Sequence, residues 1–242
     1  MAFFERDDVR IHYTDTGAGS GFPVLLIAPG GMRSTMDKWA AMPWNPLEAL
    51  AGSYRIIAMD QRNAGGSTAP ITADDGWDTY TADQMALLDH LGVERCHVIG
   101  MCIGGPYSLA LAMAAPERIA SAVLLQPIGI DDNRLAFVQM FDGWAAEVGP
   151  DHPEADAETF ASFRQNMYGG DFVFVATPDE VAAVETPLLV AMGDDLYHPQ
   201  TTSREIARLA PDATLIERWK DDDVAPETDD AIKTFLAAHT PS

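Results

Sequence analysis

One cysteine of this chain stands in a context that favours nucleophilic chemistry. Cys102 follows the apolar run 96–100, lies between Gly100 and Gly104, and precedes a segment that favours a helix to about residue 114. A sharp turn from a strand into a helix strains the backbone at its apex, so the flanking positions must lack side chains. A helix N-terminus also lowers the pKa of a thiol. The pattern predicts that Cys102 is a nucleophile; the alternative is a small buried residue in a tight turn.

Two candidates for proton transfer lie together late in the chain. Asp195 and His198 belong to the turn-forming segment 193–199, which follows an apolar run. A base must come within hydrogen-bond reach of the thiol, and a loop that flanks the cysteine turn permits this. We expect His198 to be the base and Asp195 to orient it. His198 could instead be a packed turn histidine, with Lys220 or a group of the substrate acting as the base.

Backbone amides after the first apolar core run are candidates for binding an oxyanion. The run 24–28 is followed by Pro29, Gly30, Gly31 and Met32. Amides fixed at such a turn stabilise charge that appears only in a tetrahedral intermediate. We expect one donor from Gly31 or Met32 and the other from Ile103. The alternative is an ordinary turn that ends a strand.

The elements that position these residues alternate between strand and helix patterns after a short β opening. Residues 3–5 and 9–13 predict a hairpin, and continuous apolar runs predict strands buried on both faces of a parallel sheet. The expected core strands are residues 24–28, 55–59, 96–100, 120–125, 187–192 and 213–218. The expected helices are residues 82–91 with Thr81 as the cap, 104–114, 203–210 and 228–239. The sequence therefore predicts an α/β fold, a mostly parallel central sheet flanked by helices.

The segment 127–185 interrupts this alternation and predicts a helical insertion. It is rich in aromatic side chains, which either pack the insertion onto the main domain or form apolar walls over a pocket, and both can hold. These aromatic residues are Phe137, Phe141, Trp144, Phe160, Phe163, Tyr168, Phe172 and Phe174.

Four landmarks, taken in order, resemble the α/β-hydrolase superfamily over nearly the whole chain. Residues 28–32 resemble its oxyanion turn, and residues 60–67 resemble its D-x-R-G-x-G-x-S segment with Asn63 at a glycine position. The third landmark is the cysteine turn, which resembles the nucleophile elbow G-x-S-x-G. The segment 192–199 resembles the turn that carries the acid. The resemblance implies a single α/β-hydrolase domain, residues 1–242, with a cap insertion at about residues 127–185.

Two departures from the superfamily pattern concern the catalytic groups. Cys replaces Ser at the elbow, as in dienelactone-hydrolase-like members. The superfamily places its catalytic His after the last strand, where residues 219–223 of this chain contain none. The resemblance implies an acyl hydrolase for a small ester, lactone or thioester, with an atypical triad. A non-catalytic ligand-binding or scaffold member, and an acyltransferase that uses the same elbow, are the alternatives.

Composition narrows the classes of partner. The net charge of −22, from 37 acidic and 15 basic residues, argues against nucleic acid and anionic membranes. Adaptation to salt and plain solubility both explain this charge. No residues have metal-ligand spacing, so we expect no metal or cofactor and a small-molecule substrate as the partner. The oligomeric state stays open.

The two cysteines and the start of the chain indicate the compartment. Cys96 and Cys102 are too far apart along an extended strand to form a disulfide with each other. Residues 1–10 carry charges and lack the apolar core of a secretory signal. No apolar run approaches the length of a membrane span. We therefore expect a reducing, cytoplasmic location.

Overall fold

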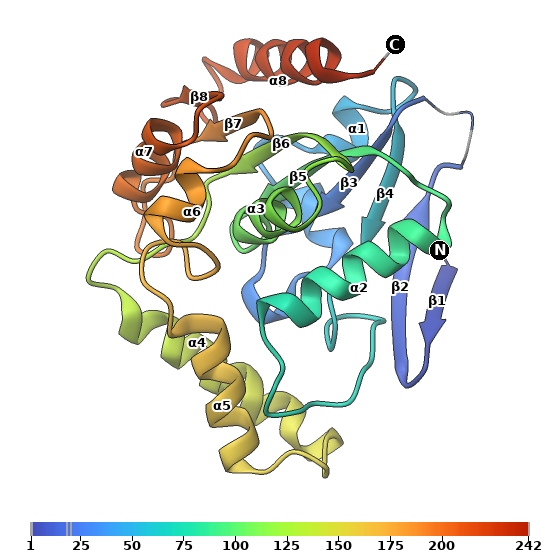
Figure 1. Ribbon diagram of the computed structural model, residues 1–242, viewed down its shortest axis with the longest axis vertical. Coiled ribbons are helices and arrows are strands. Elements are labelled where there is room, and N and C mark those ends of the chain that lie inside the picture. Colours follow the sequence, from blue (N-terminus) through green and yellow to red (C-terminus); the bar gives the residue numbers. More distant parts are fainter. Residues whose placement is uncertain (1, 18, 20, 242) are drawn as a thin grey trace.

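The structure, a computed structural model, describes residues 2–17, 19 and 21–241. These residues form one sheet of eight strands in the order β1-β2-β4-β3-β5-β6-β7-β8 (Figure 1). The pairs β1–β2 and β2–β4 are antiparallel, and the remaining pairs are parallel. The predicted fold class, a mostly parallel sheet flanked by helices, is confirmed.

The strands are short and largely apolar, as expected for a sheet covered on both faces. They span β1 Ala2–Arg6, β2 Val9–Asp15, β3 Pro23–Ile27, β4 Arg55–Met59, β5 Cys96–Met101, β6 Ile119–Leu125, β7 Leu188–Ala191 and β8 Ala213–Ile216. The helices are α1 Pro46–Ala49, α2 Trp77–His90, α3 Gly104–Ala114, α4 Arg134–Val148, α5 Ala157–Tyr168, α6 Pro178–Ala182, α7 Gln200–Leu209 and α8 Ala225–His239. Short 3₁₀ turns occur at η1 Gly31–Arg33, η2 Met36–Ala41 and η3 Gly149–Asp151.

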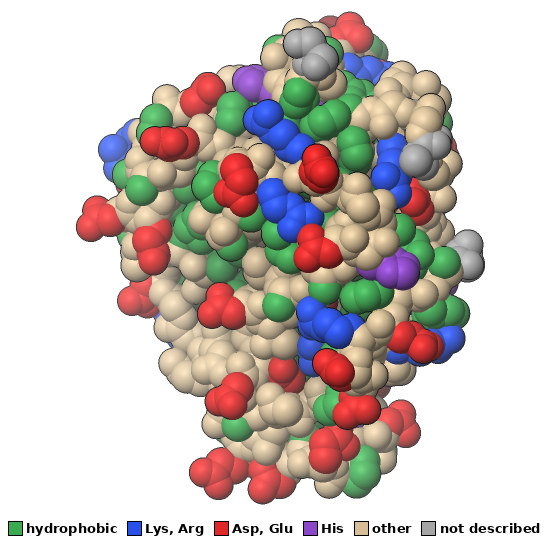
Figure 2. Space-filling view, turned by 45° about the vertical axis from the view of Figure 1, so that its right-hand side comes forward, with side chains coloured by type: hydrophobic (Ala, Val, Ile, Leu, Met, Phe, Trp, Pro, Cys, Tyr) green, Lys and Arg blue, Asp and Glu red, His purple; other side chains and the backbone are tan. Residues whose placement is uncertain are grey.

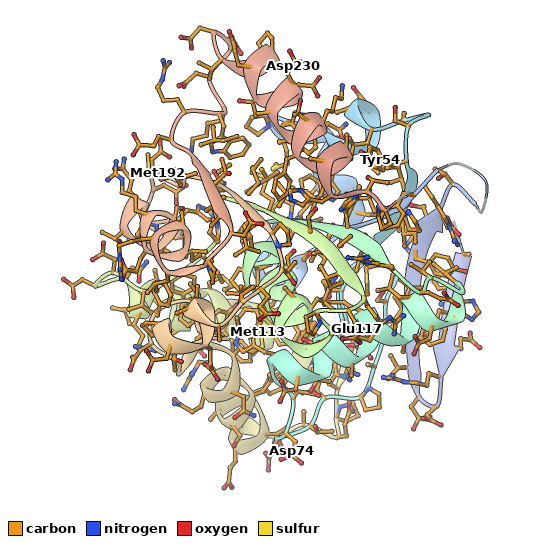
Figure 3. The ribbon with its side chains drawn as sticks, turned by 45° about the horizontal axis from the view of Figure 1, so that its top comes forward. Tyr54, Asp74, Met113, Glu117, Met192 and Asp230 are labelled. Carbon is orange, nitrogen blue, oxygen red and sulfur yellow. The ribbon has the colours of Figure 1, made fainter. Side chains whose placement is uncertain are left out.

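Successive residues of the central strands point to opposite faces and enter two separate cores. On β5, Val98 packs with α2 and α3 on one face, and Ile99 packs with α8 on the other. Side chains fill the layer between the sheet and α8, the helix that carries Asp230 (Figure 3). The sheet is therefore a rigid frame whose carboxyl-end loops can hold a site in place.

Three helices begin earlier than the sequence predicts. Helix α2 begins at Trp77, not Ala82, so Thr81 is not its cap but lies inside the helix, where its hydroxyl donates to the Trp77 carbonyl. Helix α2 extends to Trp77 because this ring is buried against Tyr107, a tertiary contact that local propensity does not reveal. Helices α7 and α8 each begin three residues early, with Pro199 just before the first and Pro226 in the first turn of the second.

Three of the helices lie between β6 and β7, within the predicted insertion. Helices α4 and α5 pack together at one end of the molecule, away from α8 (Figure 1). Their aromatic side chains form a buried cluster, in which Phe141 contacts Trp144, Phe163 and Tyr168. The assignment of residues 127–185 as a cap on a single domain stays a prediction.

Candidate active site

Cys102 lies at the apex of the turn from β5 into α3. Its φ of 60° lies in the left-handed region of backbone conformation, which residues other than glycine rarely adopt. A Cβ on Gly100 would lie 1.8 Å from the Gly104 carbonyl oxygen, and a Cβ on Gly104 would lie 2.2 Å from the Ile27 carbonyl oxygen. Both glycines are therefore required for steric reasons, and together they hold the Cys102 side chain at the carboxyl end of the sheet.

The loop between β7 and α7 carries the acid and the histidine as one hydrogen-bonded unit. His198 Nδ1 donates to Asp195 Oδ1 over 2.7 Å. The same oxygen accepts the amides of Tyr197 and His198, which fixes the carboxylate relative to the ring. A Cβ on Gly193 would lie 2.4 Å from His198 Cβ, so the loop closes tightly on this histidine.

The histidine of this unit adjoins the thiol. His198 is buried, and its Nε2 makes no hydrogen bond of standard geometry with any described residue. Burial raises the pKa of Cys102. The adjoining His198 ring and the Gly30 and Ile103 amides together have the larger, opposite effect, so the pKa lies below its ordinary value. Burial lowers the pKa of His198, but Cys102 and Asp195 raise it above its usual value. The Cys102 and His198 side chains therefore favour each other's charged forms.

Asp195 completes this electrostatic chain. Burial raises its pKa, yet the His198 ring and the two loop amides hold it below the usual value for a carboxyl. Asp195 is therefore ionised at neutral pH. An ionised carboxylate on Nδ1 fixes the imidazole tautomer whose Nε2 can accept a proton.

Backbone amides from two loops surround the thiol. The amides of Gly30 and Ile103 contact the Cys102 side chain. Ile103 is the donor that the sequence predicts, whereas Gly30 precedes the predicted Gly31 and Met32. Gly31 lines the cavity beside the thiol, and the Met32 side chain is buried in the core. Gly30 was missed because the direction of an amide in a glycine turn is not evident from residue types.

The thiol faces a cavity of about 230 Å³. Its apolar wall consists of Ile128, Phe137, Met140 and Tyr197, and the remaining lining residues are Gly30, Gly31, Cys102, Ile103 and His198. Phe137 comes from the predicted insertion. Motif reading did not single out Ile128, Met140 or Tyr197, since apolar wall residues have no signature of their own.

Lys220 lies in the loop where the superfamily keeps its histidine. Its ammonium pairs with Asp194 and donates to Gln126 Oε1 over 3.3 Å. Lys220 thereby ties the β8–α8 loop to the loop that holds His198. These contacts explain its place without a role in proton transfer.

The other histidines lie away from the thiol's cavity. His12 pairs with Asp60, whose carboxylate also accepts the amides of Met36 and Gly66. Asp60 thus organises the segment 60–67 as a structural residue. His97 is buried in the sheet, and the other three histidines have partners of their own: His90 with Tyr13, His152 with Glu154 and His239 with the Phe235 carbonyl.

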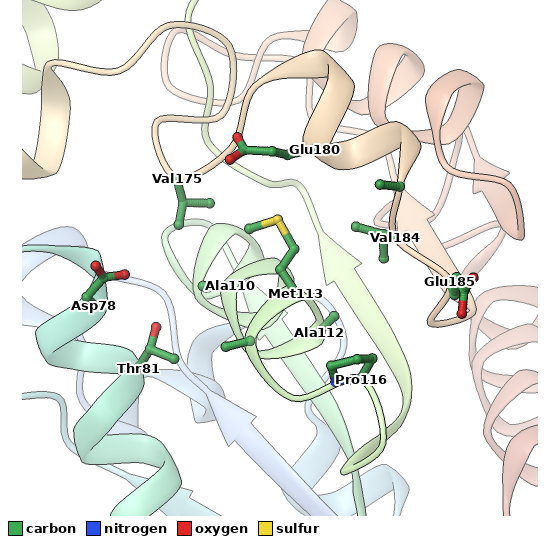
Figure 4. Close-up of a pocket in the computed structure, with 12 residues that line it drawn as sticks. Asp78, Thr81, Ala110, Ala112, Met113, Pro116, Val175, Glu180, Val184 and Glu185 are labelled. Carbon is green, nitrogen blue, oxygen red and sulfur yellow. The ribbon is translucent and has the colours of Figure 1, made fainter.

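A larger hollow of about 590 Å³ lies between α2, α3 and α6 (Figure 4). Met113 projects into it from α3, with Asp78 on one side, Glu185 on the other and Glu180 above (Figure 4). Its lining has three carboxylates and apolar side chains but no cysteine, serine or histidine. This hollow therefore has no paired thiol and imidazole of the kind found at the smaller cavity beside Cys102.

The described residues contain no cluster of three or more side chains able to hold a metal ion. In the same part of the chain no helix has both the length and the apolar character to cross a membrane. Asp and Glu side chains are scattered over the face seen in Figure 2 and do not form a single patch.

Comparisons with known proteins identify the fold family. Residues 23–183 match the family described as alpha/beta hydrolase fold. A protein of Azorhizobium caulinodans named "Putative carbamate hydrolase RutD" is 30% identical over 90% of this chain and 89% of its own length. The protein of the same name from Pseudomonas syringae pv. syringae is 27% identical over 79% of this chain and 83% of its own length. The enol-lactonase from Burkholderia xenovorans LB400 superimposes with a TM-score of 0.72 at 20% identity, over 98% of this chain and 100% of its own.

Proposed function

The chain belongs to the α/β-hydrolase fold family, and from that premise we propose that it is an acyl hydrolase with a Cys102–His198–Asp195 triad. One observation carries the proposal: the Asp195–His198 pair adjoins the thiol at the apex of a glycine-flanked turn. A nucleophile, a base and a group that orients the base are the three parts of such a triad. His198 occupies the acid loop and replaces the histidine absent after β8.

In the first half of the reaction, His198 Nε2 holds the thiol proton and the Cys102 sulfur attacks the substrate carbonyl. The carbonyl oxygen becomes an oxyanion, which the amides of Ile103 and Gly30, with Gly31 beside them, stabilise. Collapse of this intermediate breaks the bond to the leaving group. The leaving group takes the proton from His198, and an acyl thioester forms on Cys102.

In the second half, His198 takes a proton from water, and the resulting hydroxide attacks the thioester. The second tetrahedral intermediate uses the same amides. Its collapse releases the carboxylic acid and returns the proton to the Cys102–His198 pair. Asp195 stays ionised throughout and orients the imidazole.

The substrate class is a small ester, lactone or thioester. The names of two relatives add two substrate classes to be tested. The relative from Azorhizobium caulinodans is named a carbamate hydrolase, and the structural relative from Burkholderia xenovorans is named an enol-lactonase. These substrates share a carbonyl with a leaving group, which suits the proposed mechanism. Acyl transfer to a nucleophile other than water would use the same acyl thioester.

Hydrolysis of one small member of each class, by wild type and four variants, tests the proposal. We expect Cys102→Ala and His198→Ala to lower kcat by at least about 1,000-fold and Asp195→Asn by about 100-fold or more. Lys220→Met is the control and should stay within about threefold, since the Lys220–Asp194 pair is half-exposed and such pairs contribute little. Loss of activity in Lys220→Met with retention in His198→Ala would make Lys220 the base. The absence of Cys102-dependent turnover on the whole panel would favour the ligand-binding alternative.

A further inference from the structure

We propose that the cavity at Cys102 accepts only short, uncharged acyl groups, and that Met140 sets the length limit. The inference rests on the proposed function, because it concerns the acyl group that Cys102 receives. It names a substrate class and a specificity-determining residue of that site.

The size of the cavity limits the acyl chain. Its volume of about 230 Å³ is the share of liquid occupied by about eight water molecules. Pockets for drug-sized ligands span roughly 300–1,000 Å³. A cavity of about 150 Å³ holds the six carbons of benzene, so about 230 Å³ holds roughly nine carbons. An ester with a two- to four-carbon acyl chain and a six-carbon aromatic leaving group is of about this size, whereas the octanoyl ester of the same leaving group exceeds it and requires the wall to move.

Met140 is the wall residue placed to decide that limit. A Cβ on Gly31 would lie 2.8 Å from Met140 Sδ, so this side chain lies directly over the glycine turn of the oxyanion site. Phe137, one turn earlier on α4, packs edge-on against Tyr197 at a ring-centroid distance of 5.4 Å. Phe137 is also wedged between Tyr168 and Phe174 and is fully buried. Met140 is only partly buried, so it can be shortened without opening that aromatic cluster.

The charges around the cavity disfavour an anionic acyl group. No lysine or arginine is among the residues that line it. Arg33 pairs with Glu147, and Lys220 pairs with Asp194. Lys38 packs beside the turn, with its Cε 2.6 Å from the position of a Cβ on Gly30, but it is not a lining residue. A carboxylate in the apolar part would be desolvated without a cation, within a protein of net charge −22.

A chain-length series tests the size limit. p-Nitrophenyl acetate, butyrate, hexanoate and octanoate are compared by kcat/KM. For wild type we expect octanoate to be at least about tenfold poorer than butyrate, the scale of discrimination that an apolar pocket provides. In Met140→Ala the octanoate-to-butyrate ratio should rise at least about tenfold, and in Met140→Val it should rise less.

Leu135→Ala is the matched control on the same helix, because Leu135 is 67% exposed. Its ratio should equal that of wild type. A wild type that hydrolyses octanoate as well as butyrate, or a Met140→Ala ratio equal to that of wild type, would overturn the size limit.

A pair of esters of similar length tests the charge requirement. p-Nitrophenyl valerate and the mono-p-nitrophenyl ester of succinic acid differ at the chain end, where the second carries a carboxylate. We expect the charged ester to be at least about tenfold poorer in kcat/KM. Equal or better hydrolysis of the charged ester would overturn the requirement for an uncharged acyl group. If Lys38→Met then lost the hydrolysis of the charged ester, Lys38 would be the cation that binds the carboxylate.

Thiol modification separates this inference from the proposed function. Alkyl methanethiosulfonates transfer an alkylthio group to a thiolate and expel methanesulfinate, whether or not the protein hydrolyses esters. We expect the methyl reagent to modify Cys102 at least about tenfold faster than the octyl reagent, relative to a free thiol, with the gap narrowed in Met140→Ala. Selective modification without ester hydrolysis would refute the proposed hydrolase function but support the length limit of the cavity. Hydrolysis without chain-length selection in either assay would refute the length limit.

Discussion

Cys102 combines a strained backbone with a thiol whose charge is set by its neighbours. Burial alone would keep this thiol protonated, and the chain supplies the compensation from three separate loops: Gly30, Ile103 and His198. Cys96, at the start of the strand that leads into this turn, lacks such neighbours, and burial raises its pKa to about 12. The loops around the elbow, not the residue type, therefore set the pKa values of the two thiols apart, and we expect Cys102 to be the more reactive of the two.

Removal of the histidine should raise the pKa of the Cys102 thiol. With His198 in place this pKa lies below its ordinary value, because the imidazole favours the thiolate. In His198→Ala the thiol stays buried while the imidazole that opposes the effect of burial is lost, so the pKa of Cys102 should rise. The pH dependence of iodoacetamide alkylation measures it. His152→Ala, a histidine remote from the cavity, is the control, and a midpoint unchanged in His198→Ala would contradict the pairing.

His97 makes stability depend on pH by a separate route. It is buried between Ser121 and Thr240, hydrogen-bonded to both hydroxyls, and burial lowers its pKa to about 4. Because its folded pKa is below the unfolded value of about 6.5, the unfolded chain binds the proton first as the pH falls. This group should therefore cost about 1.4 kcal/mol of stability per pH unit between about pH 6.5 and 4.

The substitution His97→Gln should remove that dependence. Urea unfolding of wild type and variant at several pH values between 7.5 and 4.5 measures the difference in the free energy of unfolding. The variant should be less stable at pH 7.5, since it loses packing and hydrogen bonds, and the gap should shrink as the pH falls. A gap that stays constant would show that His97 titrates alike in both states. His152→Gln controls for the loss of any one histidine.

Among the elements, the β5–α3 turn is the one with the least steric freedom. We expect Gly100→Ala and Gly104→Ala each to destabilise the protein by about 3 kcal/mol or more, because the added methyl meets backbone carbonyls at 1.8 and 2.2 Å. Gly143→Ala on α4 is the control, since its Cβ meets nothing within 4 Å. It should stabilise by about 0.5–1 kcal/mol through helix propensity. Chemical denaturation measures all three, and a loss in Gly104→Ala no larger than about 1 kcal/mol would contradict the packing described.

The same elements show how far the sequence predicts the structure. The strands were predictable because continuous apolar runs are typical of a sheet buried on both faces. Cys102 and Asp195 were identifiable because each follows such a run in a turn of recognisable residue types. Helix α2 was predicted too short, since the buried ring of Trp77 extends it and tertiary packing overrides local propensity.

The base of the candidate site shows where prediction from sequence ends. His198 was one of six histidines, and its nearness to Asp195 along the chain favoured it without placing it at the thiol. That placement depends on the register of β5, β6 and β7, which brings two distant loops to one edge of the sheet. The Gly30 amide and the Met140 wall depend on backbone direction and helix docking in the same way.

At the scale of the whole molecule, the net charge of −22 sets the electrostatic background. Several of the described ion pairs are exposed on both sides, and such pairs contribute little each. Mutual repulsion between the remaining carboxylates destabilises the compact state. Salt should relieve this repulsion, because added ions shorten the range of the interaction.

We expect Tm to rise by about 3 °C or more between 20 mM and 500 mM NaCl, equivalent to about 1 kcal/mol for a chain of this size. The combined variant Glu94→Gln, Glu117→Gln, Asp222→Asn removes three exposed charges for which no ion pair is found in the described part of the chain. Its Tm should be higher in low salt and should rise less. A Tm independent of salt in wild type would indicate that the acidic surface serves solubility alone.

The loop 193–199 has a consequence for how such a protein can be rebuilt. It carries two of the three proposed catalytic side chains within one hydrogen-bonded turn. The loop after β8 supports it from outside: Lys220 pairs with Asp194, and the Trp219 indole donates to the Met192 carbonyl. This seven-residue segment can therefore be transferred as one unit. Grafted onto a homologous scaffold from which the histidine of the β8 loop has been removed, it offers a way to relocate a general base by exchanging seven residues.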